Sequence, residues 1–140
     1  YKGIGPALND LIGGQIQLVL PSLPVAIPQL KTNRLRGIAV SSAKRSSALP
    51  DIAAVAETFP GYVAAGWYAV YGPKALPKEI AARWNSEINR LLQLPDVKER
   101  MAGLGVEPAG GTPEQLREHV KREIIKWQNV VKTAQIKAEI

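Results

Sequence analysis

Short apolar segments alternate with helices bounded by proline and glycine through the first half of this 140-residue chain. The first helix is expected to begin at Pro6 and to end before residues 13–14, because proline is favoured at a helix start and glycine just past a helix end. Apolar strands are expected at 15–20 and 35–41, with a second, short helix between them. Helices that alternate with strands in this order predict parallel pairing and an α/β fold.

The second half has a different pattern, dominated by long amphipathic helices. After a short helix at 52–59 and a strand at 62–71, the apolar spacing predicts helices over 78–93, 95–102 and 113–134. The last of these begins with a capping box at Thr112. The change of pattern places the main boundary of the chain near residues 62–67.

Composition excludes several kinds of site. The chain has no cysteine and a single histidine, His119, so disulfides, thiol nucleophiles and a multi-histidine metal centre are excluded. Glycine-rich nucleotide motifs and a serine-nucleophile motif are also missing from the sequence. We therefore expect no catalytic residues, no metal and no cofactor. An α/β enzyme that acts on an anionic metabolite is the alternative.

The positive charge of the chain favours small anions over nucleic acid as partners. The net charge of +6 is divided between both halves, and charges of opposite sign alternate along the later helices. Aromatic residues are few and are not interleaved with a basic run, as a single-strand binder requires. The start of the first helix is a better candidate, because Gly3 and Gly5 leave its backbone N–H groups and its positive end open to an anion.

Several motifs in fixed order resemble one receptor family. They are YKGIGPALNDLIGGQI, LPSLPVAIPQLK, LRGIAVSSAKRSSALPD, GWYAVYGP and the long stretch from LPKEIAARWN to GGTPEQL. In this order they resemble the extracytoplasmic solute receptors of tripartite tricarboxylate transporters, also called Bug or TctC-type receptors. The resemblance covers essentially the whole chain.

The resemblance implies a periplasmic, non-enzymatic binding protein with the two-lobed, type II Venus-flytrap fold. Such a receptor captures a small organic acid and delivers it to the permease subunits of a membrane transporter. Family members are about twice as long, so the chain is expected to lack their N-terminal half, with its signal peptide and one glycine-rich ligand loop. Residues 1–62 are expected to form the C-terminal part of the second lobe, and 63–140 the hinge crossing and the C-terminal part of the first lobe.

The resemblance also implies where the ligand binds. The family holds carboxylates largely through backbone amides at two junctions that lead into helices, where close approach of the backbone needs glycine. Two positions depart from the family pattern, because Pro21 and Ile4 replace residues that often add polar contacts. The expected ligand-binding residues are Gly3, Ile4, Gly5, Ala7, Ser22 and Leu23.

Several strand edges are expected to be exposed in this chain. The resemblance leaves strands around Leu18, Ile38 and Val70 without neighbours in this chain, and exposed edges recruit other strands. The 140 residues are therefore expected to be either the ordered remainder of a longer polypeptide or a fragment that self-associates. Trp84 and Trp127 stand at apolar helix positions and are expected to pack in a core.

Overall fold

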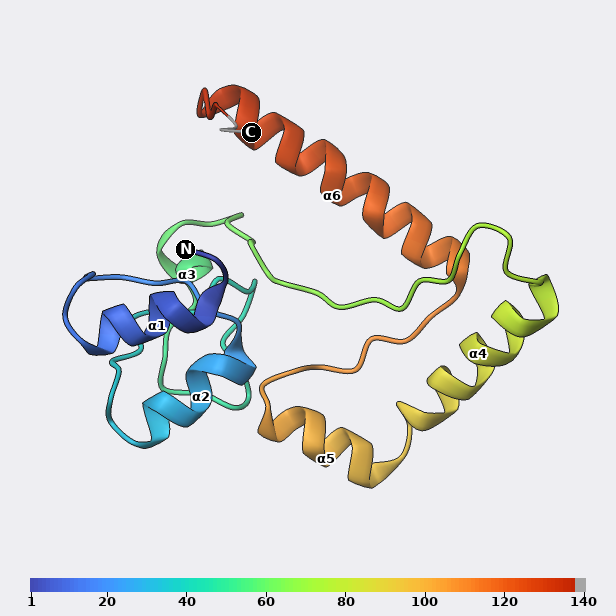
Figure 1. Cartoon of the computed structure of the whole chain (residues 1–140), viewed down its shortest axis with the longest axis horizontal. Coiled ribbons are helices and arrows are strands. Elements are labelled where there is room, and N and C mark those ends of the chain that lie inside the picture. The colour runs from blue at the N-terminus through green and yellow to red at the C-terminus, as the bar shows by residue number, and fades with distance from the viewer. Residues whose placement is uncertain (138–140) are drawn as a thin grey trace. The chain divides into compact units, whose positions relative to one another are not determined.

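The structure is a computed structural model that describes residues 1–137, and helices are its main regular elements (Figure 1). Extended segments without regular pairing connect several of the helices. In chain order the helices are α1 (Ile4–Ile12), α2 (Leu23–Lys31), α3 (Val55–Thr58), α4 (Lys78–Leu91), α5 (Pro95–Gly103) and α6 (Pro113–Thr133).

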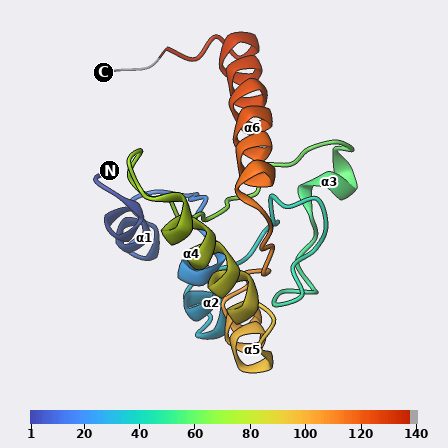
Figure 2. The ribbon, with the colours of Figure 1, turned by 90° about the vertical axis from the view of Figure 1, so that its right-hand side faces the viewer.

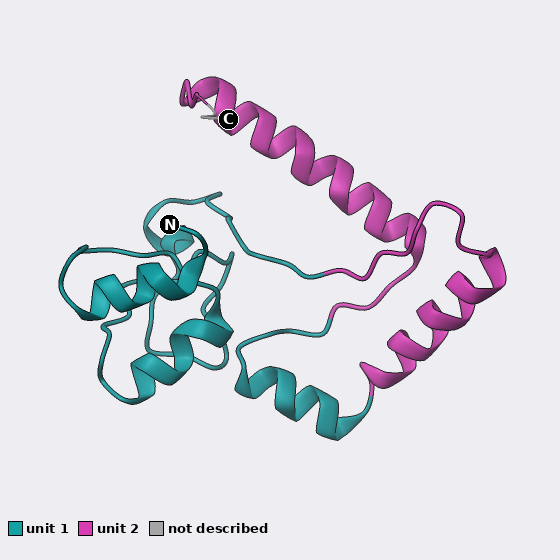
Figure 3. Cartoon of the chain, viewed as in Figure 1, with its two compact units in different colours: residues 1–68, 94–108 teal, residues 69–93, 109–140 magenta. Residues whose placement is uncertain are grey.

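The chain divides into two compact units (Figure 3). Unit 1 comprises residues 1–68 and 94–108 and holds α1, α2, α3 and α5; unit 2 comprises the remaining residues and holds α4 and α6. Residues 63–68 and α5 thus group with the N-terminal residues. The assignment of 1–62 and 63–140 to two receptor lobes stays a prediction, since the compact units describe only this chain.

Glycine and proline set the ends of the first two helices largely as predicted. Helix α1 begins at Ile4, two residues before the predicted start, because Gly3 turns the chain at φ 106° and Pro6 is tolerated within a first turn. Helix α2 is nine residues long and continues through Pro28. It ends where Asn33 adopts a left-handed conformation at φ 55°, which asparagine tolerates better than most residues.

The three predicted strands do not form a sheet within residues 1–137. The regular pairing among the described residues is an isolated parallel bridge between Val40 and Ala54. In this bridge the Val40 N–H donates to the Ala53 carbonyl at 2.9 Å, and the Val55 N–H donates to the Val40 carbonyl at 2.9 Å. A strand is stable only beside a partner strand, so the segments at 15–20 and 62–71 remain extended without a ladder. The parallel direction agrees with the prediction.

The bridge also shortens the next helix. The sequence predicts a helix over 52–59, but α3 is a single turn from Val55 to Thr58, because Ala53 and Ala54 pair with Val40 instead. Glu57 supports this start, since its Oε1 accepts the Ala54 N–H at 2.8 Å.

The buried apolar residues of the described chain all lie in unit 1. The prediction that Trp84 and Trp127 pack in a core is wrong for this chain, because they are 61% and 45% exposed. Their helices, α4 and α6, present apolar stripes that neither helix of unit 2 covers. The buried apolar residues are Ala7, Leu8, Ala26, Ile27, Val40 and Ala54.

Unit 2 is held together by an asparagine clamp, which joins Asn89 of α4 to Gly111 just before α6. The Asn89 Nδ2 group donates to the Gly111 carbonyl at 2.9 Å, and the Asn89 Oδ1 accepts the Gly111 N–H at 2.7 Å. Asn85 donates to the same carbonyl at 2.9 Å. The predicted capping box follows directly: Thr112 and Gln115 each accept the backbone N–H of the other, at 3.2 and 2.8 Å.

A helix that crosses a bilayer needs about 20 mostly apolar residues in a row. None of the helices within residues 1–137 is both long enough and apolar enough to do so.

Candidate functional site

The start of α1 is an open backbone surface. Gly3 occupies the N-cap position at φ 106° and ψ 176°, and a side chain there cannot compete for the helix N–H groups. Among the described residues, no atom lies within 4 Å of the position that a Cβ of Gly3 or Gly5 would take. Because Pro6 has no N–H, Ile4 and Gly5 carry the exposed donors of this first turn.

The start of α2 also leaves hydrogen-bonding groups open to a ligand. Ser22 is the N-cap residue, but its hydroxyl makes no capping hydrogen bond. Its carbonyl instead accepts the N–H groups of Val25 and Ala26, at 3.0 and 3.1 Å. With Pro24 lacking an N–H, the Leu23 N–H and the Ser22 hydroxyl are the groups that this start offers to a ligand.

The two starts lie on the same side of unit 1. Helices α1 and α2 are neighbours in both views and run in the same direction (Figures 1 and 2). Neither helix has an acidic residue in its first turn, so no side-chain charge there opposes the positive end of the helix dipole. The arrangement is therefore suited to an acid with one or two carboxylates.

The structure brings the predicted ligand residues into one unit but exposes them unequally. Gly3, Ile4, Gly5 and Ser22 are exposed, and Leu23 is half-buried. Ala7 is 7% exposed and belongs to the core. Contact of any of these residues with a ligand stays a prediction.

Gly105 fixes the position of α2, and the sequence reasoning missed this. It adopts φ 69° in the turn after α5, where a Cβ would lie 2.9 Å from Ile27 Cδ1 and 3.0 Å from Leu23 Cβ. The close approach holds the first turn of α2, including the candidate residue Leu23, against this turn. The signal in the sequence was the glycine after Leu104, which lies beyond the predicted helix over 95–102.

An ion pair between Arg45 and Glu57 closes the polar loop of unit 1. The Arg45 Nε and Nη2 groups donate to the two carboxylate oxygens of Glu57, both at 2.8 Å, and Nη1 donates to the Pro50 carbonyl at 3.1 Å. The side chains of both residues remain about half exposed to solvent. The hydrogen bond from Arg45, with that from the Ala54 N–H, lowers the pKa of Glu57 to about 2.

We expect the acid titration of Glu57 to report this pair. Since the pKa of Glu57 in the fold lies below its ordinary value of 4.5, the pair stabilises unit 1 fully above about pH 4.5 and loses this contribution as the pH falls towards 2. In a carbon-detected NMR titration, the Arg45→Ala change should raise the midpoint of the Glu57 carboxyl. The exposed Arg34→Ala control should leave it near 2; equal midpoints in both variants would contradict the pairing.

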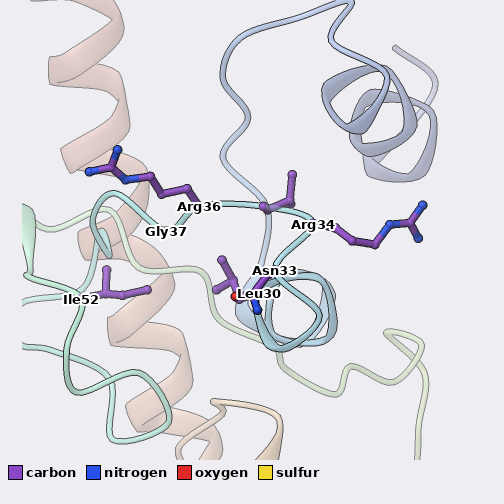
Figure 4. Close-up of a pocket in the computed structure, with 7 residues that line it drawn as sticks. Leu30, Asn33, Arg34, Arg36, Gly37 and Ile52 are labelled. Atoms are coloured by element: carbon purple, nitrogen blue, oxygen red, sulfur yellow. The ribbon is translucent and has the colours of Figure 1, made fainter.

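A hollow of about 640 Å³ lies elsewhere in unit 1 (Figure 4). It is open to solvent, and its two arginines extend away from Leu30 and Ile52. No predicted ligand residue borders it. Its lining residues are Leu30, Asn33, Arg34, Leu35, Arg36, Gly37 and Ile52.

Within residues 1–137, histidine and carboxylate side chains do not gather in any group of three or more that could hold a metal ion.

The chain matches one protein-family model and several known proteins of the same kind. Residues 1–136 match the family model described as the tripartite tricarboxylate transporter family receptor. The protein BugT of Bordetella pertussis is 36% identical over 133 residues, which cover 94% of this chain and 41% of BugT. The chain thus spans about 40% of the length of the first curated relatives that it matches.

Solved structures of similar proteins also share the backbone fold of this chain. Rpa4515 of R. palustris, solved with adipate, is 36% identical and superposes with a TM-score of 0.92, over 97% of this chain and 46% of that one. MatC of Rhodopseudomonas palustris, solved with bound malate, is 29% identical with a TM-score of 0.79, over 94% of this chain and 46% of that one. The backbone therefore follows part of the two-lobed α/β fold of periplasmic binding proteins.

Proposed function

This chain belongs to the tripartite tricarboxylate transporter receptor family, and we propose that it forms part of a receptor that captures a small organic acid and delivers it to the transporter's membrane permease. A receptor with this task works outside the cytoplasmic membrane, so we place it in the periplasm. On this proposal residues 1–62 contribute to the second lobe, and 63–140 supply the hinge crossing and part of the first.

The observation that carries the proposal is the pair of uncapped helix starts in unit 1. Each offers backbone donors at its positive end, with no acidic side chain in the first turn. A carboxylate satisfies these donors and interacts favourably with the helix dipole. Two starts on one side of the unit match a ligand with two acidic groups better than a ligand with one.

Dicarboxylates are the ligand class that we propose. Rpa4515 was solved with adipate and MatC with malate, and both compounds carry two carboxylates. In this chain the Ile4 and Gly5 amides would bind one carboxylate, with Gly3 shaping the approach. The Leu23 amide and the Ser22 hydroxyl would bind a second acidic or polar group. Ala7 would support the α1 start from the core.

Capture without chemical change is the role that fits the residues. Binding through backbone amides holds an acid without a nucleophile or a general base, and the candidate residues include no general base that could activate the Ser22 hydroxyl. No feature of the described chain favours the alternative of an α/β enzyme.

Titration with dicarboxylates, followed by amide NMR, tests the proposal on the chain itself. Addition of adipate or malate should shift the Ile4, Gly5 and Leu23 amides in a saturable way, at millimolar concentrations where even a weak site is seen. An amide outside unit 1, such as that of Gln115, should not respond. Shifts with nucleotides but not with dicarboxylates, or dicarboxylate shifts confined to other amides, would contradict the proposal.

The Gly5→Asp change should weaken this binding by roughly fivefold to tenfold, because a negative charge in the first turn neutralises the helix end and repels the ligand. An acidic residue at this position favours the helix, so the fold should be kept. The matched control is Gly66→Asp, at an exposed glycine with no atom within 4 Å of its Cβ position among the described residues. Equal losses in both variants would point to a general charge effect and contradict the assignment.

A further inference from the structure

The hollow at the C-terminal end of α2 lies apart from the candidate carboxylate site. Its lining begins at Leu30, in the last turn of α2, whereas the candidate donors Ser22 and Leu23 stand at the start of the same helix. The 9 residues of α2 rise by about 13 Å, so a molecule in the hollow leaves the start of α2 free. The hollow is therefore a separate feature of unit 1.

The hollow has an apolar floor and a basic rim. Leu30, Leu35 and Ile52 are half-buried and supply the floor. Arg34 and Arg36 are exposed on the rim, and their side chains extend in opposite directions (Figure 4). A ligand that contacts both guanidinium groups therefore has to reach across the apolar floor.

The turn after α2 fixes the backbone of the rim. Asn33 adopts φ 55°, its N–H donates to the Leu30 carbonyl at 3.0 Å, and the Arg34 N–H donates to the Gln29 carbonyl at 3.0 Å. This pair of hydrogen bonds is the Schellman motif, in which the position of Arg34 is frequently apolar and contacts the helix. Here it carries an exposed charge instead, so the motif holds an arginine at the rim without any ligand.

Glycine at position 37 keeps the floor open. A Cβ at Gly37 would collide with Ile52 Cδ1 and would lie 3.5 Å from Leu30 Cδ2. A larger residue would therefore force the Ile52 side chain to move. The absence of a side chain at Gly37 leaves Leu30 and Ile52 accessible from the hollow, which has a volume of about 640 Å³.

The positive charge around the hollow is not neutralised within the described chain. Residues 11–50 contain five lysine and arginine residues and no acidic residue. Among the ion pairs of residues 1–137, this segment contributes Arg45, which pairs with Glu57. The helix dipole favours a cation in the last turn of α2, which accounts for Lys31 but not for Arg36, which lies beyond the turn.

We propose that the hollow docks an acidic peptide segment of another protein, in which an apolar side chain stands between acidic residues. The planar guanidinium groups of Arg34 and Arg36 suit carboxylates, and the floor suits the apolar side chain. Two guanidinium groups that extend in opposite directions are not placed to hold one small anion together, and a flat lipid surface does not fill a concave hollow. Docking needs no bound organic acid, so it is independent of carboxylate capture.

A labelled peptide tests the proposal on the chain itself. The probe is Glu-Glu-Leu-Glu-Glu with fluorescein at its N-terminus, and its fluorescence anisotropy is followed as the chain is added. Binding should saturate at one peptide per chain and weaken as salt is added. Replacement of the leucine by serine should weaken it by roughly fivefold, because the floor then has no apolar partner. At constant ionic strength, millimolar adipate should not displace the peptide.

A matched pair of variants locates the docking surface. Arg36→Ala should weaken peptide binding by roughly fivefold, and the double variant with Arg34→Ala by more than about tenfold, because charge-assisted hydrogen bonds are lost. Lys44→Ala is the control, since it removes the same charge from an exposed position of unit 1 outside the hollow. It should change binding by no more than about twofold. All three positions are exposed, so helix content should be unchanged.

Several outcomes would overturn the proposal. They are the absence of saturable binding at millimolar peptide, equal losses in Arg36→Ala and Lys44→Ala, and equal affinity for the leucine and serine peptides. Tighter binding to single-stranded DNA or to vesicles that contain phosphatidylserine, lost in Arg36→Ala, would assign the hollow to another class of partner and would also overturn it.

Discussion

The Gly105→Ala variant should lose roughly 2–4 kcal/mol of stability in unit 1. Gly105 adopts φ 69°, which an alanine adopts only with strain. The added Cβ would also lie 2.9 Å from Ile27 Cδ1 and 3.0 Å from Leu23 Cβ, so α2 has to move away from the turn. Amide exchange at Ala26 and Ile27, measured under native conditions, should be strongly accelerated.

The control for this change is Gly103→Ala, two residues earlier in the same turn of chain. Gly103 is the last residue of α5, and no described atom lies within 4 Å of its Cβ position. Alanine favours helix over glycine by up to about 1 kcal/mol, so this variant should be neutral or slightly stabilising. If both variants behaved alike, contact between the turn and α2 would not be the cause. The same experiment bears on the candidate site, because displacement of Leu23 should weaken dicarboxylate binding.

The Asn89→Ala variant should have the second large effect, a loss of roughly 2–3 kcal/mol in unit 2. Asn89 donates to the carbonyls of Asn85 and Gly111 and accepts the Gly111 N–H, at distances between 2.7 and 2.9 Å. Removal of the side chain leaves the Gly111 N–H without this acceptor and frees the turn that leads into α6. Exchange of the Gly111 and Gln115 amides should therefore accelerate.

Asn129→Ala is the matched control for the clamp. Asn129 lies exposed in α6, where alanine has the better helix propensity, so this variant should be neutral or slightly more stable. An Asn89→Ala variant as stable as this control would show that the clamp does not hold α4 and α6 together.

Local features of the fold could be predicted because they depend on a few neighbouring residues. The capping box at Thr112 and the extents of α4, α5 and α6 agree with the sequence pattern to within a few residues. The predicted start of α3 was wrong, because a bridge to Val40 competes for the backbone of Ala53 and Ala54. That competitor lies more than ten residues away and leaves no mark in the local pattern.

The candidate site, too, could be predicted from the sequence only in part. The glycine and proline pattern located both helix starts, and the family resemblance linked them to carboxylates. The structure adds that the Ser22 hydroxyl makes no capping hydrogen bond at the start of α2 and that Ala7 is buried. The pair between Arg45 and Glu57 spans twelve residues and could not be read from either residue alone. The same holds for the contact of Gly105 with α2.

The sequence by itself determined the receptor family, the helices and their ends, apart from the start of α3, since each depends on residue order over a short range or on motifs in fixed order. Only the tertiary structure decided which predicted strands are paired, which helix starts lie side by side and which apolar faces remain open. A strand needs a partner to supply its hydrogen bonds, and a helix stripe needs a surface to bury it. Those partners are distant in sequence, and in this chain the surfaces around Ile38 and Trp84 remain without them among the described residues.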